Sequence, residues 1–407
     1  MGKNDLLSLS LYQLLASNRS GVFVVYFPLF LTTEKGASVP VALAFLSAAY
    51  VAASLLGPFA GRLSDRVGRR RPFLLVAEAG ALPLFLLVGF APGYVLAGTL
   101  FLFAQVVLSI GAPALNAYVG DLSRDRERAQ GYGLLNATSA AGGIAGFIAT
   151  AFLIDRWGYG VLFPFVAAVM IGTVLVVVLL VPDRAVTYSR RRKPLSEYRP
   201  LLSFSVLVSI RSLGSGAVGT FFGVLAAELG ASAPQIALIA ISGLLTSALV
   251  SVPLGRYVDR TGEIRGIWYG TLVTLGGIVV FLLASSWPVL IPAQVLRYAG
   301  FALLSSGMLA YVANRAAPGH RAEELGVFSL INSTFWSLGP LAGGIALAFA
   351  GNLGLFSFAL GTTVISLVAI EVVYLGRARR GARRLAGGKA PPESAPDPGS
   401  GTGSSAA

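Results

Sequence analysis

The 407-residue sequence contains no cysteine and a single histidine, His320. Without cysteine the chain can form neither a disulfide framework nor a cysteine-bound zinc site, and one histidine cannot supply the paired-histidine motif of metalloproteases. The sequence also lacks a Walker A phosphate-binding loop and a G-x-S-x-G nucleophile motif. It therefore predicts no metal site, no cofactor and no enzyme activity.

Charged residues are also scarce. Only 12% of the residues are charged and 55% are hydrophobic, whereas soluble domains are about 25% charged. This composition predicts a membrane protein. The net charge of +13 could suggest a nucleic-acid partner. In so apolar a chain, however, lysines and arginines are expected in loops that face anionic lipid headgroups, so the predicted partner is the lipid bilayer and not nucleic acid.

Apolar runs of about 20 residues, long enough to cross a bilayer, recur along the chain. In the first half they cover residues 10–31, 39–60, 72–90, 94–118, 131–154 and 160–181. In the second half they cover residues 201–227, 234–254, 266–285, 287–312, 325–350 and 352–375. Because only helices or closed barrels satisfy backbone hydrogen bonds in lipid, the sequence predicts an all-α membrane protein with about twelve transmembrane helices.

The positive charges are distributed unevenly between the two sides of these spans. Of the 31 lysines and arginines, Lys35 and Arg156 fall on one side, and Arg19, Arg211 and Arg297 fall inside spans. The remaining 26 are on the other side, which by the positive-inside rule is cytoplasmic. We therefore expect a plasma (inner) membrane protein with both termini in the cytoplasm and, since no cleavage site follows the first span, a retained first helix.

The two halves of the chain repeat each other. Residues 31–40 recur as residues 225–234, and at the same offset of 194 the pattern Gly61-Arg62-x-x-Asp65-Arg66-x-Gly68 recurs from Gly255 to Gly262. Parallel repeats of this kind place a solute site near the membrane midplane, between two pseudo-symmetric six-helix halves. The predicted parts are a first half (1–182), a basic cytoplasmic linker (183–200), a second half (201–376) and a basic, then disordered, cytoplasmic tail (377–407).

A basic segment from Gly61 to Leu74 separates the second and third spans. Its glycines Gly61 and Gly68 permit a sharp turn, and Pro72 suits the first turn of the next helix. The segment resembles the loop between the second and third helices of the major facilitator superfamily, whose pattern is G-x-L-a-D-r-x-G-r-r/k. This resemblance implies a monomeric secondary active transporter that moves a small solute by alternating access without ATP.

The resemblance also implies a conformational switch. In the family, the loop aspartate, here Asp65, meets the start of the eleventh helix in the outward-open state. The loop arginines pair with an acidic residue that ends the fourth helix, here Asp121. The members of the predicted switch, including its copy in the second half, are Gly61, Asp65, Arg66, Gly68, Arg69, Asp121, Asp259 and Arg260. Pro182-Asp183 is similar to a short motif that follows the family's sixth helix.

Three arginines inside spans are the first candidates for solute binding, because charge in a bilayer is costly. Arg19 and Arg211 occupy near-equivalent positions in the first helix of each half. Two guanidiniums facing each other would bind a carboxylate or phosphate, as in the family's phosphate antiporters. With Arg297 as a possible third ligand, we favour an organic or phosphorylated anion as solute. The alternative role of Arg19 and Arg211 is as gate elements or as arginines that snorkel to the interface.

Further candidates are polar or aromatic residues on plausible cavity faces, since such residues orient bound solutes. Gln105 and Asn116 are eleven residues apart, which predicts one helix face. The others are Asn136, Tyr311, Asn332 and Trp336. Glu78 is the candidate protonation site, with a neutral or helix-paired glutamate as the alternative, so transport could be coupled to a proton or to an exchanged anion.

Two other functions remain open. The segment Gly339-Pro340-Leu341-Ala342-Gly343-Gly344 looks like a motif that drug/proton antiporters carry in their fifth helix, although it lies in the predicted eleventh. The first alternative is therefore proton-coupled efflux of drugs or sugars, unless these small residues serve only close helix packing. A more remote alternative is a receptor or scaffold that does not transport.

Overall fold

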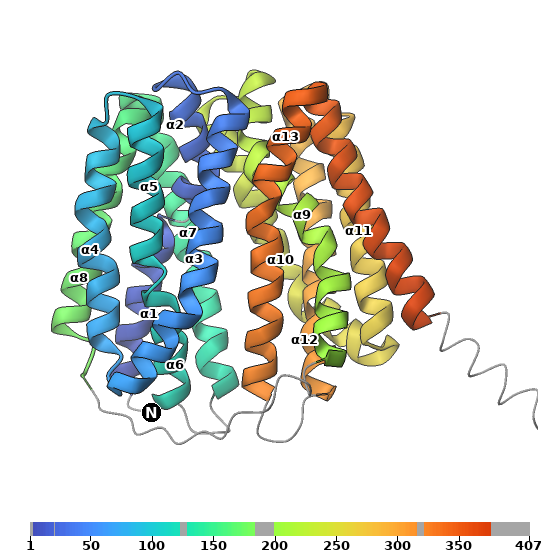
Figure 1. The fold of residues 1–407 in the computed structure, drawn as a ribbon, viewed down its shortest axis with the longest axis horizontal. Helices are drawn as coiled ribbons and strands as arrows, with labels where there is room; N and C mark the ends of the chain where they lie inside the picture. Colours follow the sequence, from blue (N-terminus) through green and yellow to red (C-terminus); the bar gives the residue numbers. More distant parts are fainter. Residues whose placement is uncertain (1–2, 20, 123–127, 184–198, 316–320, 376–407) are drawn as a thin grey trace, which may run out of the picture.

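The computed structural model describes residues 3–19, 21–122, 128–183, 199–315 and 321–375. Over these residues the regular structure is entirely helical. Eleven apolar helical segments are long enough to cross a membrane. One of them, Glu324–Tyr374, reverses at Ala350 and Gly351, where Gly351 has φ 60°, and so crosses twice (Figure 1). The described residues therefore make twelve crossings, and the predicted fold class is confirmed.

The first six crossings come from the segments before the central linker. They are formed by α1 (Lys3–Asn18), η1 (Val22–Tyr26), α2 (Phe27–Thr33), α3 (Val39–Val67), α4 (Arg71–Phe90), α5 (Tyr94–Leu108), α6 (Gly111–Leu122), α7 (Arg128–Trp157), η2 (Tyr159–Val161) and α8 (Leu162–Leu179). We call this group the first half. The end of the bundle that carries the turn at Gly68 is called the basic face below.

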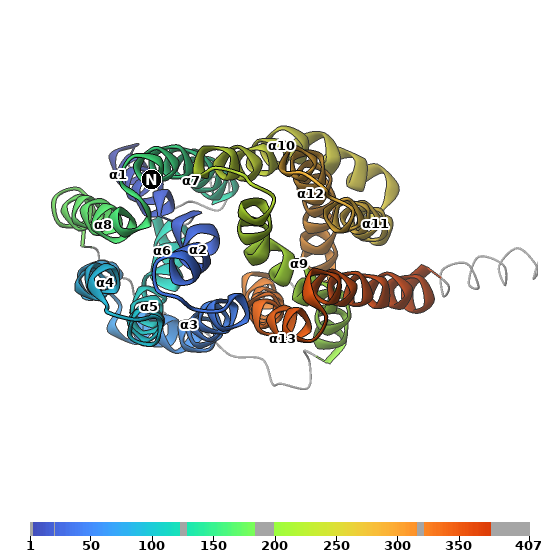
Figure 2. The ribbon, with the colours of Figure 1, turned by 90° about the horizontal axis from the view of Figure 1, so that it is seen from above.

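The other six crossings form the second half. They are formed by α9 (Arg199–Glu228), α10 (Ala233–Thr261), α11 (Glu263–Leu282), η4 (Trp287–Val289), α12 (Leu290–Arg315), α13 (Arg321–Ile370) and η5 (Glu371–Leu375). Seen along the crossings, the two halves lie side by side and meet where α3 packs on α13 and where α7 packs on α10 (Figure 2). The interface between the halves is therefore built mainly from these four helices, with α9 and η1 at its centre.

Large apolar side chains cover the outside of the bundle. Phe349, Leu249 and Leu283 are each more than two-thirds exposed, which is the arrangement expected of helices that face lipid. The buried residues include polar and charged side chains as well as apolar ones. In a bilayer such buried polar groups are the informative ones, because they would be costly if they faced lipid.

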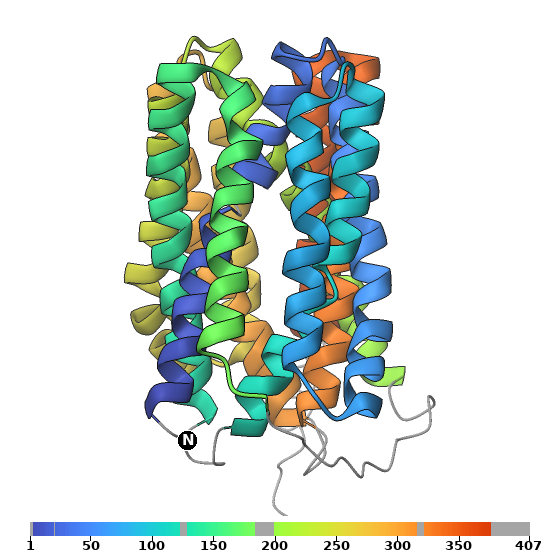
Figure 3. The same cartoon turned by 90° about the vertical axis from the view of Figure 1, so that its left-hand side faces the viewer.

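Two crossings that the sequence predicts as continuous α-helices depart from regular α-helical geometry. The first crossing (Figure 3, dark blue) contains a π-helical segment, η1, between α1 and α2. The fourth is interrupted at Ser109 and Ile110, between α5 and α6. There the Ser109 hydroxyl donates to the Val106 carbonyl at 2.7 Å. Such a local side-chain bond competes with the helical ladder, and apolar composition alone does not reveal it.

The basic segment is also folded differently from the prediction. Helix α3 continues to Val67, so Gly61 is helical and lies against Pro113, and the turn is made at Gly68 alone. Gly68 has φ 69° and ends α3 in the left-handed conformation that favours glycine at a helix C-terminus. Pro72 lies in the first turn of α4, as predicted.

Glycines spaced four residues apart bring helices into close contact. A methyl group at Gly142 or Gly146 of α7 would overlap backbone carbonyls of α1. Gly339 and Gly343 of α13 lie against α9 in the same way, and the next glycine, Gly344, faces α3 of the first half. The Gly339–Gly344 segment therefore serves close helix packing here, as small residues do in membrane proteins.

Replacing Gly146 with alanine is expected to destabilise the first half, because the added methyl group would overlap the Asn18 carbonyl. The matched control is Gly276→Ala in α11, where nothing lies within 4 Å of the added carbon. The control should be neutral or stabilising, by up to about 1 kcal/mol from helix propensity. The measurement is the yield of monodisperse protein and its thermal unfolding midpoint in detergent. Equal midpoints for the two variants would show that the α1–α7 contact can relax.

Candidate functional site

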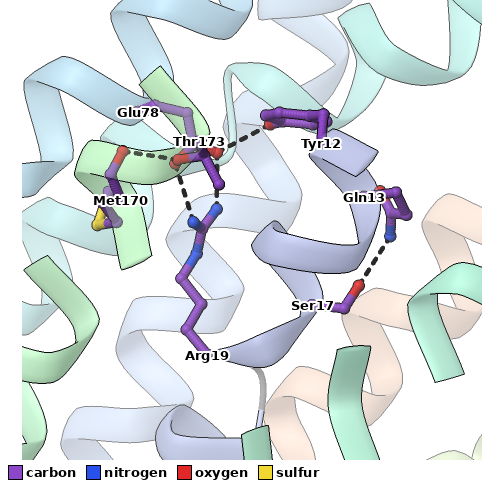
Figure 4. A network of polar contacts seen from close by, with 7 residues as sticks. All are labelled: Tyr12, Gln13, Ser17, Arg19, Glu78, Met170 and Thr173. Carbon is purple, nitrogen blue, oxygen red and sulfur yellow. Dashed lines mark hydrogen bonds and ion pairs between the residues drawn. The ribbon is translucent and has the colours of Figure 1, made fainter. Parts of the chain in front are cut away.

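A buried ion pair lies in the first half, where α1, α4 and α8 meet. The Arg19 guanidinium donates two hydrogen bonds to Glu78, from Nη1 to Oε2 at 2.9 Å and from Nη2 to Oε1 at 2.7 Å (Figure 4). Tyr12 donates its hydroxyl to Oε1 and Thr173 donates its hydroxyl to Oε2, each at 2.8 Å. The carboxylate thus accepts four hydrogen bonds, which is close to the limit of its lone pairs.

The surroundings of this pair remove it from water. Glu78 has no exposed surface, and Arg19 is 5% exposed. Among the carboxylates whose side chains the structure describes, Glu78 is the only one that is buried. Glu78 is therefore paired with Arg19 in this conformation, and its role as a protonation site stays a prediction. Both Nη atoms of Arg19 donate to Glu78. In this conformation Arg19 and Arg211 therefore do not form a joint anion site.

Arg211, in the middle of α9, has a different environment. It is 2% exposed, and its Nε has no hydrogen-bond partner. Its Nη2 approaches the thioether sulfur of Met308 on α12 at 3.8 Å, a weak acceptor. The next residue, Ser212, donates its hydroxyl to the Asn332 side-chain oxygen at 2.8 Å. Arg211 therefore lies inside the second half as a cation for which no carboxylate partner is described.

Arg297, on α12, is held by neutral groups. Its Nε donates to the Gln294 side-chain oxygen at 2.9 Å, and its guanidinium lies 4.8 Å from the centre of the Tyr298 ring. One Nη lies 3.5 Å from the place where a Cβ on Gly219 of α9 would be. Arg297 thus faces α9, as a member of a solute site at the centre of the molecule would, and no contact with Arg19 is described.

Uncharged polar and aromatic contacts join α3 of the first half to α13 of the second half. The Ser47 hydroxyl donates to the Ser337 carbonyl at 2.5 Å, and the hydroxyls of Ser54 and Ser337 lie 3.2 Å apart. The rings of Tyr50 and Trp336 meet edge to face, with centroids 5.6 Å apart. We call these five residues of α3 and α13 the seam.

A second set of contacts joins the two halves on the face opposite the basic face. The Tyr26 hydroxyl donates to the Ala233 carbonyl at the start of α10, at 3.1 Å. A Cβ added to Gly344 would lie 3.4 Å from the Pro40 carbonyl oxygen, and a Cβ added to Gly223 would overlap the Val25 side chain. All hydrogen bonds described between the halves lie here or at mid-membrane. This conformation is therefore closed on the face opposite the basic loops.

The other predicted solute ligands are dispersed. Trp336 is in the seam and Asn332 is near Arg211, as described above. Tyr311 instead lies near the basic face, stacked on Phe204 at 3.8 Å and covered by the Arg315 guanidinium at 3.6 Å. Gln105 is buried with its amide nitrogen unpartnered, whereas Asn116 is exposed. The prediction that Gln105 and Asn116 share a helix face is wrong, because the helix breaks between them. The Asn136 side chain lies outside the described residues.

The predicted switch residues form contacts within the first half. Asp65 pairs with Arg70 at 2.7 Å, and Arg69 pairs with Asp183 at 3.3 Å. No contact of Asp65 with α13 is described, which agrees with a conformation closed on the opposite face. Arg66 and the second-half residues Asp259 and Arg260 are exposed. The side chain of Asp121 lies outside the described residues, so its predicted pairing stays a prediction.

Sequence reasoning missed three residues of these centres. Arg70 is buried beneath the switch, where its Nη1 also donates to the Ser64 hydroxyl at 2.8 Å. Tyr12 and Thr173 complete the shell of Glu78, and they are separated from it by 66 and 95 residues. For Glu78 itself the apolar pattern gives a signal, because Glu78 shares a face of α4 with Leu74, Ala77 and Ala81, and such an apolar face points to the protein interior.

The surface also carries an apolar groove of about 570 Å³, lined by α3, α4 and the fourth crossing. Its walls include Leu56, Phe59, Leu63 and Val76, which are all exposed on the outer surface. The groove therefore faces lipid and does not lie between the halves. In the part of the chain that the structure describes, no three histidines, cysteines or carboxylates lie close enough together to hold a metal ion.

Twelve crossings in two repeated halves, with buried charge centres and a basic segment between the second and third crossings, are the features of a membrane transporter. A sequence model described as Major Facilitator Superfamily matches residues 9–211 and again residues 202–400. The chain belongs to this superfamily. The resemblance of its basic segment is thereby confirmed.

Curated relatives of the chain are resistance proteins. It is 26% identical over 329 residues to multidrug resistance protein 2 of Bacillus subtilis (strain 168), which covers 74% of this chain and 78% of the relative. It is 25% identical over 343 residues to the class C tetracycline resistance protein of Escherichia coli, which covers 81% of this chain and 84% of that protein.

Solved structures show the same fold at low sequence identity. The nucleoside transporter NupG matches with a TM-score of 0.76 and 12% identity, over 91% of this chain and 99% of its own. The human organic anion transporter MFSD10 matches with a TM-score of 0.67 and 15% identity, over 90% of this chain and 99% of its own. These likenesses establish the fold and leave the solute open.

Proposed function

We propose that this protein exports amphipathic organic solutes across the plasma membrane in exchange for protons, with its basic face in the cytoplasm. The observation that carries the proposal is the buried Glu78 carboxylate, held by Arg19 of the first crossing. A titratable group that is buried between helices of a transporter is a candidate proton carrier. The coupling site would then be Glu78, and the solute site would be the interface between the halves.

The solute class is supported by the chemistry of the seam. Tyr50 and Trp336 offer aromatic faces, and Ser47, Ser54 and Ser337 offer hydroxyl and carbonyl groups. Sites that bind drug-like molecules are mostly apolar and aromatic with a few polar groups. Multidrug and tetracycline resistance proteins among the relatives support the same class and the outward direction.

The coupling step follows from the charges in the first half. When Glu78 takes a proton, its negative charge is lost, and Arg19 is left without a counter-charge inside the bundle. A guanidinium keeps its own proton, so Arg19 must find water or another acceptor, which favours a rearrangement of the first crossing. Loss of the proton on the other side of the membrane would restore the ion pair. Differential stability of the two states is what a coupling ion must supply.

The basic face would open and close through the switch residues. In the described conformation Asp65 pairs with Arg70, and no contact of Asp65 with the second half is described. When the molecule opens on the opposite face, Asp65 would approach the start of the eleventh crossing, where the helix N-terminus favours an anion. Arg66, Arg69 and the second-half pair Asp259 and Arg260 would support this closure.

Transport measurements on Glu78→Gln test the proposal. Purified protein in proteoliposomes is given a fluorescent amphipathic dye, with and without a pH gradient. Wild type should move dye in response to the gradient, whereas the variant should lose about tenfold or more of this gradient-driven rate, because glutamine cannot carry the proton. Dye exchange without a gradient should survive in the variant, since the seam is unchanged and glutamine, unlike leucine, keeps an amide oxygen that can accept a hydrogen bond from Arg19.

Glu371→Gln is the matched control, because Glu371 is also a carboxylate at the end of an apolar crossing but is only half-buried. This control should leave both rates intact. If Glu78→Gln responds to the gradient as wild type does, Glu78 is a structural partner of Arg19 and the coupling proposal fails. If the wild-type protein moves no dye with or without a pH gradient, the proposed solute class fails.

An organic or phosphorylated anion is the second candidate solute, and one observation favours it. Arg211 is buried near the centre of α9 with an unpartnered Nε, so an acidic group on the solute would find a cation there. Arg19 is engaged by Glu78, so the two arginines would not share such a solute in this conformation. Gradient-driven movement of an organic phosphate, lost in Arg211→Gln, would support this candidate over the first.

A further inference from the structure

The two halves differ at equivalent positions of their charge centres. When the seven buried residues of α4 are shifted by 193 positions, each coincides with a buried residue of α11. Glu78 then corresponds to Thr271. Arg19 corresponds to Arg211, because both lie at near-equivalent places in the first helix of their half. The first half thus has a guanidinium with its carboxylate, and the second half has a guanidinium with a threonine.

Thr271 does not replace the missing acceptor. It has no exposed surface, and its hydroxyl donates to the Ile267 carbonyl of its own helix at 2.7 Å. Close to Arg211, the described contact is the Met308 sulfur, and Nε remains unpartnered. The Arg211 side chain is therefore 98% buried with its positive charge uncompensated by the described residues.

Such a charge requires a counter-ion. Removal of one member of a buried ion pair costs several kcal/mol, and arginine does not escape this cost by losing its proton. We propose that Arg211 binds a small exogenous anion in the second half, in the place that the carboxylate of Glu78 takes in the first half. The ligand is a chloride-sized ion or the carboxylate group of an organic solute. This inference concerns binding and stands whether or not Glu78 carries a proton.

The test is the thermal unfolding midpoint of purified protein at constant ionic strength, with potassium gluconate replaced stepwise by potassium chloride. Gluconate serves as the reference anion because it is larger and more strongly hydrated than chloride. The midpoint of the wild type should rise and then saturate, by about 2 to 5 °C, as expected for a ligand that binds only the folded state. A second series with potassium benzoate separates the two sources of the anion.

Three variants show whether Arg211 is the ligand. Arg211→Met should lose the anion response. Thr271→Glu should also lose it and should be at least as stable in gluconate as the wild type is in chloride, because it supplies an internal carboxylate at the position of Glu78. Arg297→Met removes another cation of the second half, one that already has the Gln294 acceptor, and should keep the response.

A response to chloride that both Arg211→Met and Thr271→Glu lose supports an inorganic anion. The same pattern with benzoate alone supports the acid group of a solute. A wild-type midpoint that changes with neither salt overturns the proposal, as does a response that Thr271→Glu retains. Thr271→Glu decides the matter even if Arg211→Met yields no folded protein. Loss of dye transport in the Glu78 experiment would leave every one of these outcomes unchanged.

Discussion

A disulfide between positions 43 and 344 is expected to stop transport completely and reversibly. Gly344 of α13 is so close to α3 that a Cβ placed on it would lie 3.4 Å from the Cβ of Leu43. Disulfides need Cβ atoms about 3.5–4.5 Å apart, so Leu43→Cys with Gly344→Cys should oxidise readily. Because the chain has no cysteine of its own, no other disulfide can form within it. The link would hold the halves together on the face opposite the basic loops.

The measurement compares dye transport by the oxidised and the reduced double variant in proteoliposomes. Oxidation should lower the rate by about tenfold or more and a reductant should restore it, since alternating access requires this face to open in each cycle. Val258→Cys with Gly266→Cys is the matched control, with Cβ atoms 3.5 Å apart inside the second half. It should form its disulfide and keep its rate. If the oxidised double variant at positions 43 and 344 transports dye as fast as the same variant after reduction, these helices stay together throughout the cycle.

Much of the fold could be predicted because membrane helices depend on local properties. Length and composition are sufficient to locate twelve crossings, since lipid forces every apolar run to satisfy its own backbone. The π-helical segment of the first crossing and the break at Ser109 could not be located, because apolar composition does not reveal local side-chain bonds or contacts with other helices. Gly146, for example, lies against the Asn18 carbonyl from more than 120 residues away. Apolar periodicity carries no information about such a contact.

The candidate site was only partly predictable for a related reason. Arg19, Arg211 and Glu78 could each be singled out, because a charge in a span is rare. Their partners could not be identified, since the direction in which a helix faces its neighbours is set by packing and not by its own sequence. Arg19 therefore seemed to be a partner for Arg211, whereas it is the partner of Glu78, 59 residues away.

The stability of Arg19 and Glu78 variants should be strongly asymmetric. Glu78→Leu leaves a guanidinium buried without its counter-charge, and we expect this variant to lose about 3–5 kcal/mol or to fail to fold. Arg19→Met leaves a carboxylate that also keeps bonds from Tyr12 and Thr173 and can take up a proton to become neutral. Its loss should therefore be smaller. The double variant Arg19→Met with Glu78→Leu should recover most of the stability, because neither charge is left alone.

Yield, monodispersity and thermal midpoint in detergent measure this cycle, with the double variant as its internal control. If the double variant is no more stable than Glu78→Leu, the loss comes from packing around Leu74 and Ala77 and not from the charge. The recovered double variant then separates structure from function. A folded protein without this pair should still exchange dye between the halves but should not respond to a pH gradient. It lacks both the Glu78 carboxylate, which would bind the proton, and the Arg19 guanidinium, which would lose its counter-charge when the proton binds.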